Sequence, residues 1–149
     1  MIRHLERHDL ATPAFRALLW LACEVDADEL DRIIRAELPE LQVLGWYAGG
    51  ELTGFAAYHD ALERATLEYI AVAESAQGRG VGRSLIAHVA ESVSSASIVA
   101  ETDDDAVEFY RRLGFDVQPL LEIDPRWPQR RRYRCTRSTN LSRARGTQA

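Results

Sequence analysis

The sequence predicts a single α/β or α+β domain in which helices flank a mixed sheet. Its length of 149 residues fits one domain. Hydrophobic residues make up 46% of the chain and charged residues 28%, a balance typical of a globular protein that buries a core. Segments with the apolar spacing of helices alternate with short apolar runs typical of strands, so both kinds of element are expected.

Four helices are predicted. The first, over 13–23, has Thr12 as its N-cap. The second begins at Asp26, with Glu29 in an arrangement similar to a capping box, and is expected to stop at Pro39. The third follows the glycine-rich segment at 77–83, and the fourth begins within 102–105 and ends before a C′ glycine at 114.

Six strands are predicted, and the first two are joined by Ala48-Gly49-Gly50-Glu51, which is a hairpin signal. Their approximate ranges are 42–47, 52–58, 67–72, 98–100, a strand from Phe115 onward, and 131–136. We therefore expect a domain over residues 1–137, followed by a polar, disordered tail over 138–149.

Composition narrows the function class. No apolar run approaches the roughly 18 residues that a membrane span needs, and the N-terminus lacks the apolar segment of a signal peptide, so a cytoplasmic protein without membrane contact is expected. The cysteines, Cys23 and Cys135, have the spacing of neither a disulfide framework nor a metal site, so no metal is expected. All 18 basic residues are arginine, which excludes Schiff-base chemistry on a lysine of this chain.

Basic charge gathers near the C-terminal end. Residues 111–149 carry ten arginines and three acids, whereas residues 1–110 carry eight arginines and twenty acids. One interpretation is a nucleic-acid-binding end, which would show salt-sensitive binding. The other is that Arg130, Arg131, Arg132 and Arg134 flank and decorate the last strand. No aromatic-and-basic signature accompanies them, so the second interpretation is favoured.

The segment QGRGVGR, residues 77–83, is the strongest chemical signal. A glycine-rich turn between a strand and a helix exposes backbone N–H groups at the positive helix end, which suits a phosphate. A P-loop is excluded because Arg83, five residues after Gly78, stands where its second glycine would be. A dinucleotide fingerprint is excluded because its third glycine comes one residue early, at Gly82.

The same segment resembles the Q/RxxGxG/A signature of the GNAT N-acetyltransferase superfamily. The preceding LEYIAV is similar to that family's fourth strand, and AETDDDAVEFYRRLGF is similar to its later strand–helix signature. The close match covers residues 67–115. The resemblance implies a GNAT-like mixed, mostly antiparallel sheet flanked by helices, and acetyl-CoA as co-substrate.

The resemblance also implies site residues. Backbone amides of the loop would hold the pyrophosphate of acetyl-CoA, and the strand before it would contact the pantetheine arm and the thioester. Asp103 matches a family position that is often asparagine, and an Asp there lacks the amide N–H donor. The implied cofactor-binding set is Ile70, Ala71, Val72, Gln77, Gly78, Arg79, Gly80, Val81, Gly82, Arg83, Ser84 and Asp103.

Two residues are candidates for acid–base catalysis. Glu68 alternates with Ile70 and Val72 on one strand face, beside the implied thioester site, and would serve as the base. The other interpretation of Glu68 is an ion pair with an arginine across the sheet. Tyr110 matches the family tyrosine that donates a proton to the departing sulfur, whereas the pattern alone also allows a structural core tyrosine.

The sequence therefore predicts an acetyl-CoA-dependent N-acetyltransferase that moves an acetyl group to a primary amine by direct transfer. The acceptor is either a small-molecule amine or a protein amine. The acids at 24, 26, 28, 29 and 31 would attract a cationic acceptor or simply cap and solvate a helix. Trp127 is a candidate wall for the acceptor site.

The alternative function is a non-catalytic acyl-CoA-binding sensor or scaffold. A homodimer is one option for assembly.

Overall fold

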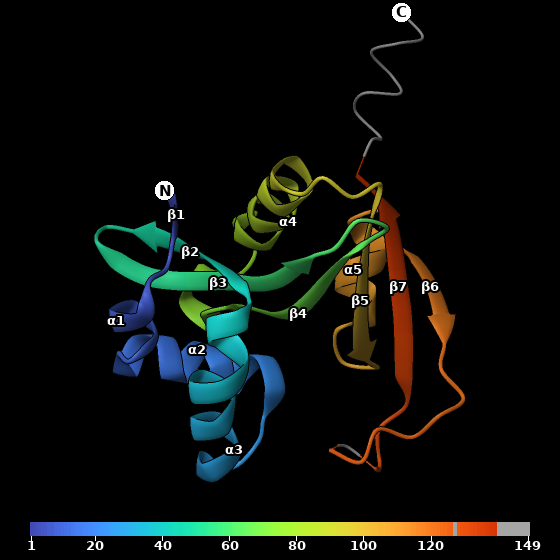
Figure 1. Cartoon of the computed structure of the whole chain (residues 1–149), viewed down its shortest axis with the longest axis horizontal. Coiled ribbons are helices and arrows are strands. Elements are labelled where there is room, and N and C mark those ends of the chain that lie inside the picture. The colour runs from blue at the N-terminus through green and yellow to red at the C-terminus, as the bar shows by residue number, and fades with distance from the viewer. Residues whose placement is uncertain (127, 140–149) are drawn as a thin grey trace, which may run out of the picture. The chain divides into compact units, whose positions relative to one another are not determined.

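The computed structural model describes residues 1–126 and 128–139, and its sheet has seven strands in the order β1-β2-β3-β4-β5-β7-β6 (Figure 1). β4 and β5 pair in parallel. The pairs β1–β2, β2–β3, β5–β7 and β6–β7 are antiparallel. The mixed, mostly antiparallel sheet with flanking helices confirms the predicted fold class.

The chain divides into two compact units. The first comprises Met1–His59 and Glu68–Val89, and the second comprises Asp60–Leu67 and the residues from Ala90 onward. The strands are β1 (Ile2–His4), β2 (Gln42–Ala48), β3 (Glu51–Asp60), β4 (Ala65–Val72), β5 (Ser97–Asp103), β6 (Asp116–Pro119) and β7 (Arg132–Ser138). The helices are α1 (Arg7–Leu10), α2 (Pro13–Cys23), α3 (Ala27–Arg32), α4 (Val81–Ser92) and α5 (Val107–Arg112).

The predicted caps of the first unit are confirmed. The Thr12 hydroxyl accepts a hydrogen bond from the Phe15 N–H at 3.2 Å, and the Asp26 carboxylate accepts one from the Glu29 N–H at 2.8 Å. The predicted stop at Pro39 is wrong: α3 continues as a π-helical segment, Ile33–Glu37, and then as a 3₁₀ turn, Leu38–Glu40. Proline is tolerated because it lies in the first turn of that 3₁₀ segment, where its missing N–H is not needed.

Two adjacent residues of β3, Gly54 and Phe55, pack against helices on opposite faces of the strand. Phe55 points to α2, where its ring meets Phe15 edge-to-face with the ring centroids 4.8 Å apart. Gly54 points the other way, to α4, because side chains alternate along a strand. A Cβ on Gly54 would lie 3.0 Å from a methyl carbon of Val81 and 3.4 Å from one of Leu85. In Figure 1, α4 and α2 accordingly lie on opposite sides of β3.

The second unit contains β5, α5, β6 and β7. The fourth helix starts later than predicted, at Val107, because Thr102 and Asp103 still belong to β5 and pair with β7. As predicted, it ends before Gly114, whose φ is +86°. The Phe115 N–H donates to the Tyr110 carbonyl at 3.1 Å, which closes a Schellman motif.

The last described residues continue the second unit. β7 ends at Ser138, and the Thr139 N–H donates to the Ala96 carbonyl at 2.9 Å. The remainder of the predicted tail, 140–149, and Trp127 lie outside the described residues. Among the residues that are described, no helix is long and apolar enough to cross a membrane.

Candidate active site

The glycine-rich segment connects β4 to α4 in the first unit, by way of a short 3₁₀ turn at Glu74–Ala76. Gly78 and Gly80 have φ angles of +78° and +80°, a region that residues with a Cβ rarely adopt. A Cβ added at either position would meet no atom within 4 Å, so it would project into open space. Glycine is thus needed here for its backbone conformation, and the space beside it is free for a ligand.

The N–H groups of this segment are available. The N–H groups of residues 78–83 have no hydrogen-bond partner among the residues that the structure describes, and the Ser84 N–H is the first to donate within the helix, to the Gly80 carbonyl at 3.0 Å. The first turn of α4 holds no acid, while Arg79 and Arg83 are exposed. Free amides at a positive helix end, flanked by two guanidinium groups, form an environment that suits an anion.

Two contacts hold the loop in place. The Gln77 side chain donates to the Val72 carbonyl at 3.0 Å, which ties the start of the loop to the end of β4. Val81, the first residue of α4, packs on Gly54 of β3. The resemblance implies that the backbone of Val72 contacts the pantetheine arm or the thioester, and in this structure the Val72 carbonyl is engaged by Gln77.

The side chains of β4 alternate between an exposed and a buried face, as predicted. Glu68 is exposed, and Ile70 and Val72 are partly exposed on the same face. Leu67 and Tyr69 point to the opposite side and are buried. Glu68 therefore lies on the solvent-accessible face of β4, as a base for an incoming amine would have to. Its catalytic role stays a prediction.

Tyr110 belongs to the second unit, on α5. Its ring is 5% exposed and meets Phe109 and Phe115 edge-to-face, each with ring centroids 5.3 Å apart. Burial raises the pKa of Tyr110, so the hydroxyl stays protonated throughout the physiological range. Burial likewise raises the pKa of the neighbouring Cys135 thiol to about 11, which disfavours a reactive thiolate. Tyr110 is thus built as a core residue that keeps its proton.

A family model described as the acetyltransferase (GNAT) family matches residues 6–115. The chain belongs to this family. The match confirms the family that the glycine-rich segment and the LEYIAV strand indicated.

Individual relatives cover the chain to different extents. Streptothricin acetyltransferase of Streptomyces lavendulae is 37% identical over 76 residues, which are 46% of this chain and 40% of that protein. The fold is similar to that of ribosomal-protein-S18-alanine N-acetyltransferase from Escherichia coli, with a TM-score of 0.73 and 21% identity over 93% of both chains. It is also similar to aminoglycoside 6′-N-acetyltransferase complexed with coenzyme A, with a TM-score of 0.72 and 14% identity over 93% of this chain and 97% of that one.

Asp103 departs from the asparagine of the GNAT pattern, and the structure shows its contacts. Its carboxylate accepts a hydrogen bond from the Asp105 N–H at 3.0 Å and forms an ion pair with Arg130 at 2.7 Å. The carboxylate thus organises the turn between β5 and α5. Sequence reasoning missed Arg130 as its partner because the two residues are 27 positions apart.

The arginines near the C-terminal end are likewise part of the fold of this GNAT protein. Arg130 pairs with Asp103, Arg134 pairs with Glu101 across β5 and β7 at 3.3 Å, and Arg132 is buried. These contacts agree with the interpretation that the arginines decorate the last strand. The described residues contain no group of three or more His, Cys, Asp or Glu that could hold a metal ion.

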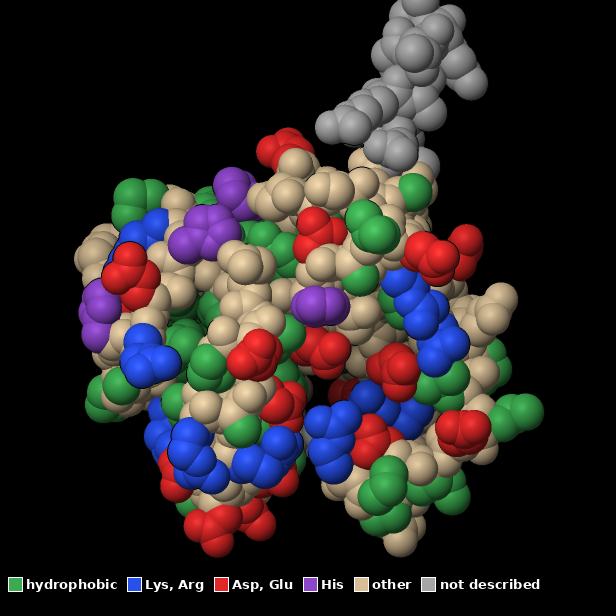
Figure 2. Space-filling view, in the orientation of Figure 1, with side chains coloured by type: hydrophobic (Ala, Val, Ile, Leu, Met, Phe, Trp, Pro, Cys, Tyr) green, Lys and Arg blue, Asp and Glu red, His purple; other side chains and the backbone are tan. Residues whose placement is uncertain are grey.

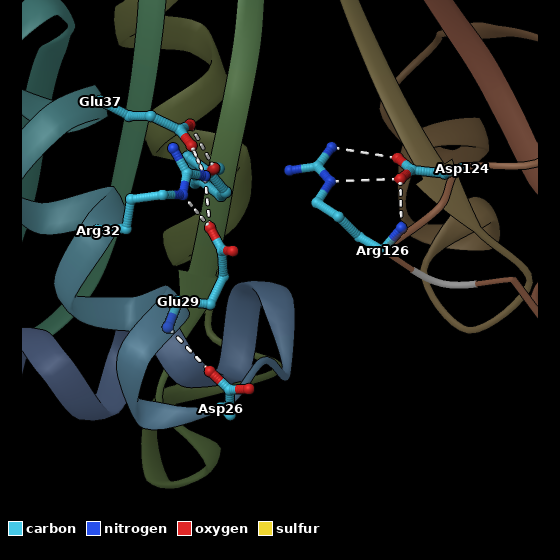
Figure 3. A network of polar contacts seen from close by, with 7 residues as sticks. Asp26, Glu29, Arg32, Glu37, Asp124 and Arg126 are labelled. Atoms are coloured by element: carbon cyan, nitrogen blue, oxygen red, sulfur yellow. Dashed lines mark hydrogen bonds and ion pairs between the residues drawn. The ribbon is translucent and has the colours of Figure 1, made fainter.

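The acids near α3 are mostly engaged as well. Asp31 pairs with Arg16 at 2.6 Å, and Asp26 is the N-cap of α3. Glu29 and Glu37 both contact Arg32 (Figure 3). Figure 2 shows arginine and acidic side chains interspersed over this end of the first unit, in the same orientation as Figure 1. These contacts favour helix capping and ion pairing as the roles of these acids, rather than attraction of a cationic acceptor.

Proposed function

We propose that this GNAT-family chain is an acetyl-CoA-dependent N-acetyltransferase that moves an acetyl group to a primary amine by direct transfer. The observation that carries the proposal is the loop at Gly78–Arg83, with its unpaired amides and the open space beside two glycines of positive φ. A pyrophosphate fits this environment because it offers several negatively charged oxygens to several N–H donors.

The relatives suggest which acceptors to test. Streptothricin and aminoglycosides are named as small-molecule acceptors, and the S18 alanine as a protein acceptor. A side-chain amine with a pKa of about 10.4 is almost fully protonated at pH 7, whereas an α-amino group, with a pKa of about 7.8, is partly neutral. A high-pKa acceptor therefore needs a base, and Glu68 supplies a carboxylate on the accessible face of β4.

Two residues, Glu68 and Tyr110, would each carry out one proton transfer. Acetyl-CoA, when bound, supplies an acetyl thioester that a neutral amine can attack. Glu68 would accept the proton that the ammonium must lose, directly or through a water. Tyr110, whose hydroxyl stays protonated, would give a proton to the departing sulfur and would recover it from the acceptor amine, which loses its second proton as the amide forms, or from water. Cys23 and Cys135 are both buried, which supports direct transfer over a cysteine-linked acyl enzyme.

The test is release of free CoA thiol from acetyl-CoA across a panel of amines that includes a polyamine, an aminoglycoside, streptothricin and a peptide with N-terminal alanine. Because the chain has no lysine, acetyl groups cannot accumulate on its own side-chain amines, which keeps the background low. Amine-dependent release of CoA supports the acetyltransferase function. Tight CoA binding without release on any amine would favour the non-catalytic sensor, and the absence of CoA binding would contradict both hypotheses.

A further inference from the structure

A polar network in the first unit joins α3 to β4 directly behind the proposed base. The Tyr69 hydroxyl donates to one oxygen of the Glu37 carboxylate at 2.7 Å. The other carboxylate oxygen contacts the Arg32 guanidinium, which also contacts Glu29 (Figure 3). Tyr69 is only 6% exposed, whereas the Glu37 side chain is 30% exposed, so this hydrogen bond joins a buried hydroxyl to a partly exposed carboxylate.

The network depends on the π-helical segment Ile33–Glu37. The Leu38 N–H donates to the Ile33 carbonyl, a bond from residue i+5 to residue i. In an α-helix only residues three or four apart face each other, whereas the wider π turn brings residues five apart onto one face. Arg32 and Glu37 are five apart, so the π geometry explains how they pair and how Glu37 reaches Tyr69. π segments are rare and occur frequently at functional sites.

Tyr69 lies between Glu68 and Ile70, and its side chain points to the opposite face of β4. Holding the Tyr69 hydroxyl therefore fixes the rotation of β4 about its own axis at this point. That rotation determines where the Glu68 carboxylate points on the other face. The network thus acts on the proposed base through one residue of backbone.

We propose that Tyr69 and Glu37 are positioning residues for Glu68 in the transfer reaction. The inference rests on the proposed function, because it concerns the base of that reaction. Tyr69→Phe keeps the ring and its packing and removes only the hydroxyl. We expect it to lower kcat/KM for a high-pKa amine roughly tenfold, since a displacement of about 1 Å can cost roughly 10²-fold.

The matched control is Tyr47→Phe. Tyr47 belongs to β2 of the same unit, and its hydroxyl also takes part in a side-chain hydrogen bond, which it accepts from Arg3 at 2.9 Å, but it has no part in the network. We expect this variant to turn over at the parent rate.

A double-mutant cycle separates positioning from general destabilisation. If Tyr69 acts through Glu68, Tyr69→Phe should cost nothing further in a Glu68→Gln background, because the group that it positions is already gone. Glu37→Gln retains an oxygen that can accept from Tyr69, so it should keep more activity than Glu37→Ala even if Tyr69→Phe folds poorly.

The experiments distinguish failure of the positioning inference from failure of the proposed function. Parent-like turnover by Tyr69→Phe overturns the inference, and so do losses that add fully to those of Glu68→Gln. In both cases amine-dependent release of CoA by the parent would leave the proposed function standing. Absence of that release in the parent itself would be a failure of the proposed function instead.

Discussion

Replacing Gly80 by alanine tests whether the loop is the phosphate cradle. The φ of Gly80 is +80°, so the new Cβ strains the backbone, and it also enters the open space beside the free amides. Gly50 offers a matched control: its φ is +82°, a Cβ there also meets no atom within 4 Å, and it lies in the β2–β3 hairpin. The two substitutions share the backbone strain and differ in the site that they disturb.

The expected magnitudes follow from this geometry. Holding alanine in a left-handed conformation costs about 1–2 kcal/mol of folding free energy at either position. For a chain of this size that lowers Tm by about 2–8 °C. A hydrogen bond to a charged group is worth about 1.5–3 kcal/mol, so the loss of one pyrophosphate contact at Gly80 weakens CoA binding by roughly ten- to 150-fold.

Calorimetric titration with CoA and a thermal melt of each variant supply the measurements. We expect similar drops in Tm for Gly80→Ala and Gly50→Ala, and a large rise in Kd for Gly80→Ala alone. Parent-like Kd in Gly80→Ala would refute the assignment of the loop to the pyrophosphate. Equal rises in Kd for both variants would show that CoA affinity merely follows stability.

Three further substitutions probe the chemistry and the support of the site. Tyr110→Phe should lower kcat toward the smaller end of roughly 10²–10⁴-fold with little change in CoA affinity, measured by steady-state kinetics and titration; full activity would leave Tyr110 a core residue only. Glu68→Gln should slow a high-pKa amine, with a deficit that shrinks at alkaline pH, and an unchanged pH–rate profile would remove Glu68 as base. Gly54→Val should cost about 1–3 kcal/mol by overpacking and also weaken CoA binding; a parent-like Tm would contradict the close contact with Val81.

The features that sequence reasoning captured are local ones. Thr12 and Asp26 cap helices, and the turn at Gly49 and Gly50 joins two strands, because a few neighbouring residues determine each of these conformations. The glycine-rich loop belongs to the same class. Its spacing between a strand and a helix dictates both its free amides and its positive φ angles.

The features that it missed depend on contacts between distant residues. The Tyr69–Glu37 hydrogen bond spans 32 positions, and no spacing rule predicts it. The π segment escaped notice because the apolar stripe of Leu30, Ile33 and Leu38 reads as an ordinary helix and Pro39 as its end. Strand β1, only three residues long, escaped because so short an element has no periodicity of its own to recognise.

Gly54 shows that the loop sequence and the packing of distant residues together determine the candidate site. The loop sequence dictates free amides, but packing decides where those amides lie in the first unit. Val81 is both the first residue of α4 and the residue that rests on Gly54, with only 3.0 Å between its methyl carbon and the place of an added Cβ. A side chain at position 54 would press on Val81, and any resulting shift of the start of α4 would carry the candidate anion-binding amides with it. A glycine on β3, about 25 residues before the loop, is therefore as much a part of the candidate site as the glycines within it.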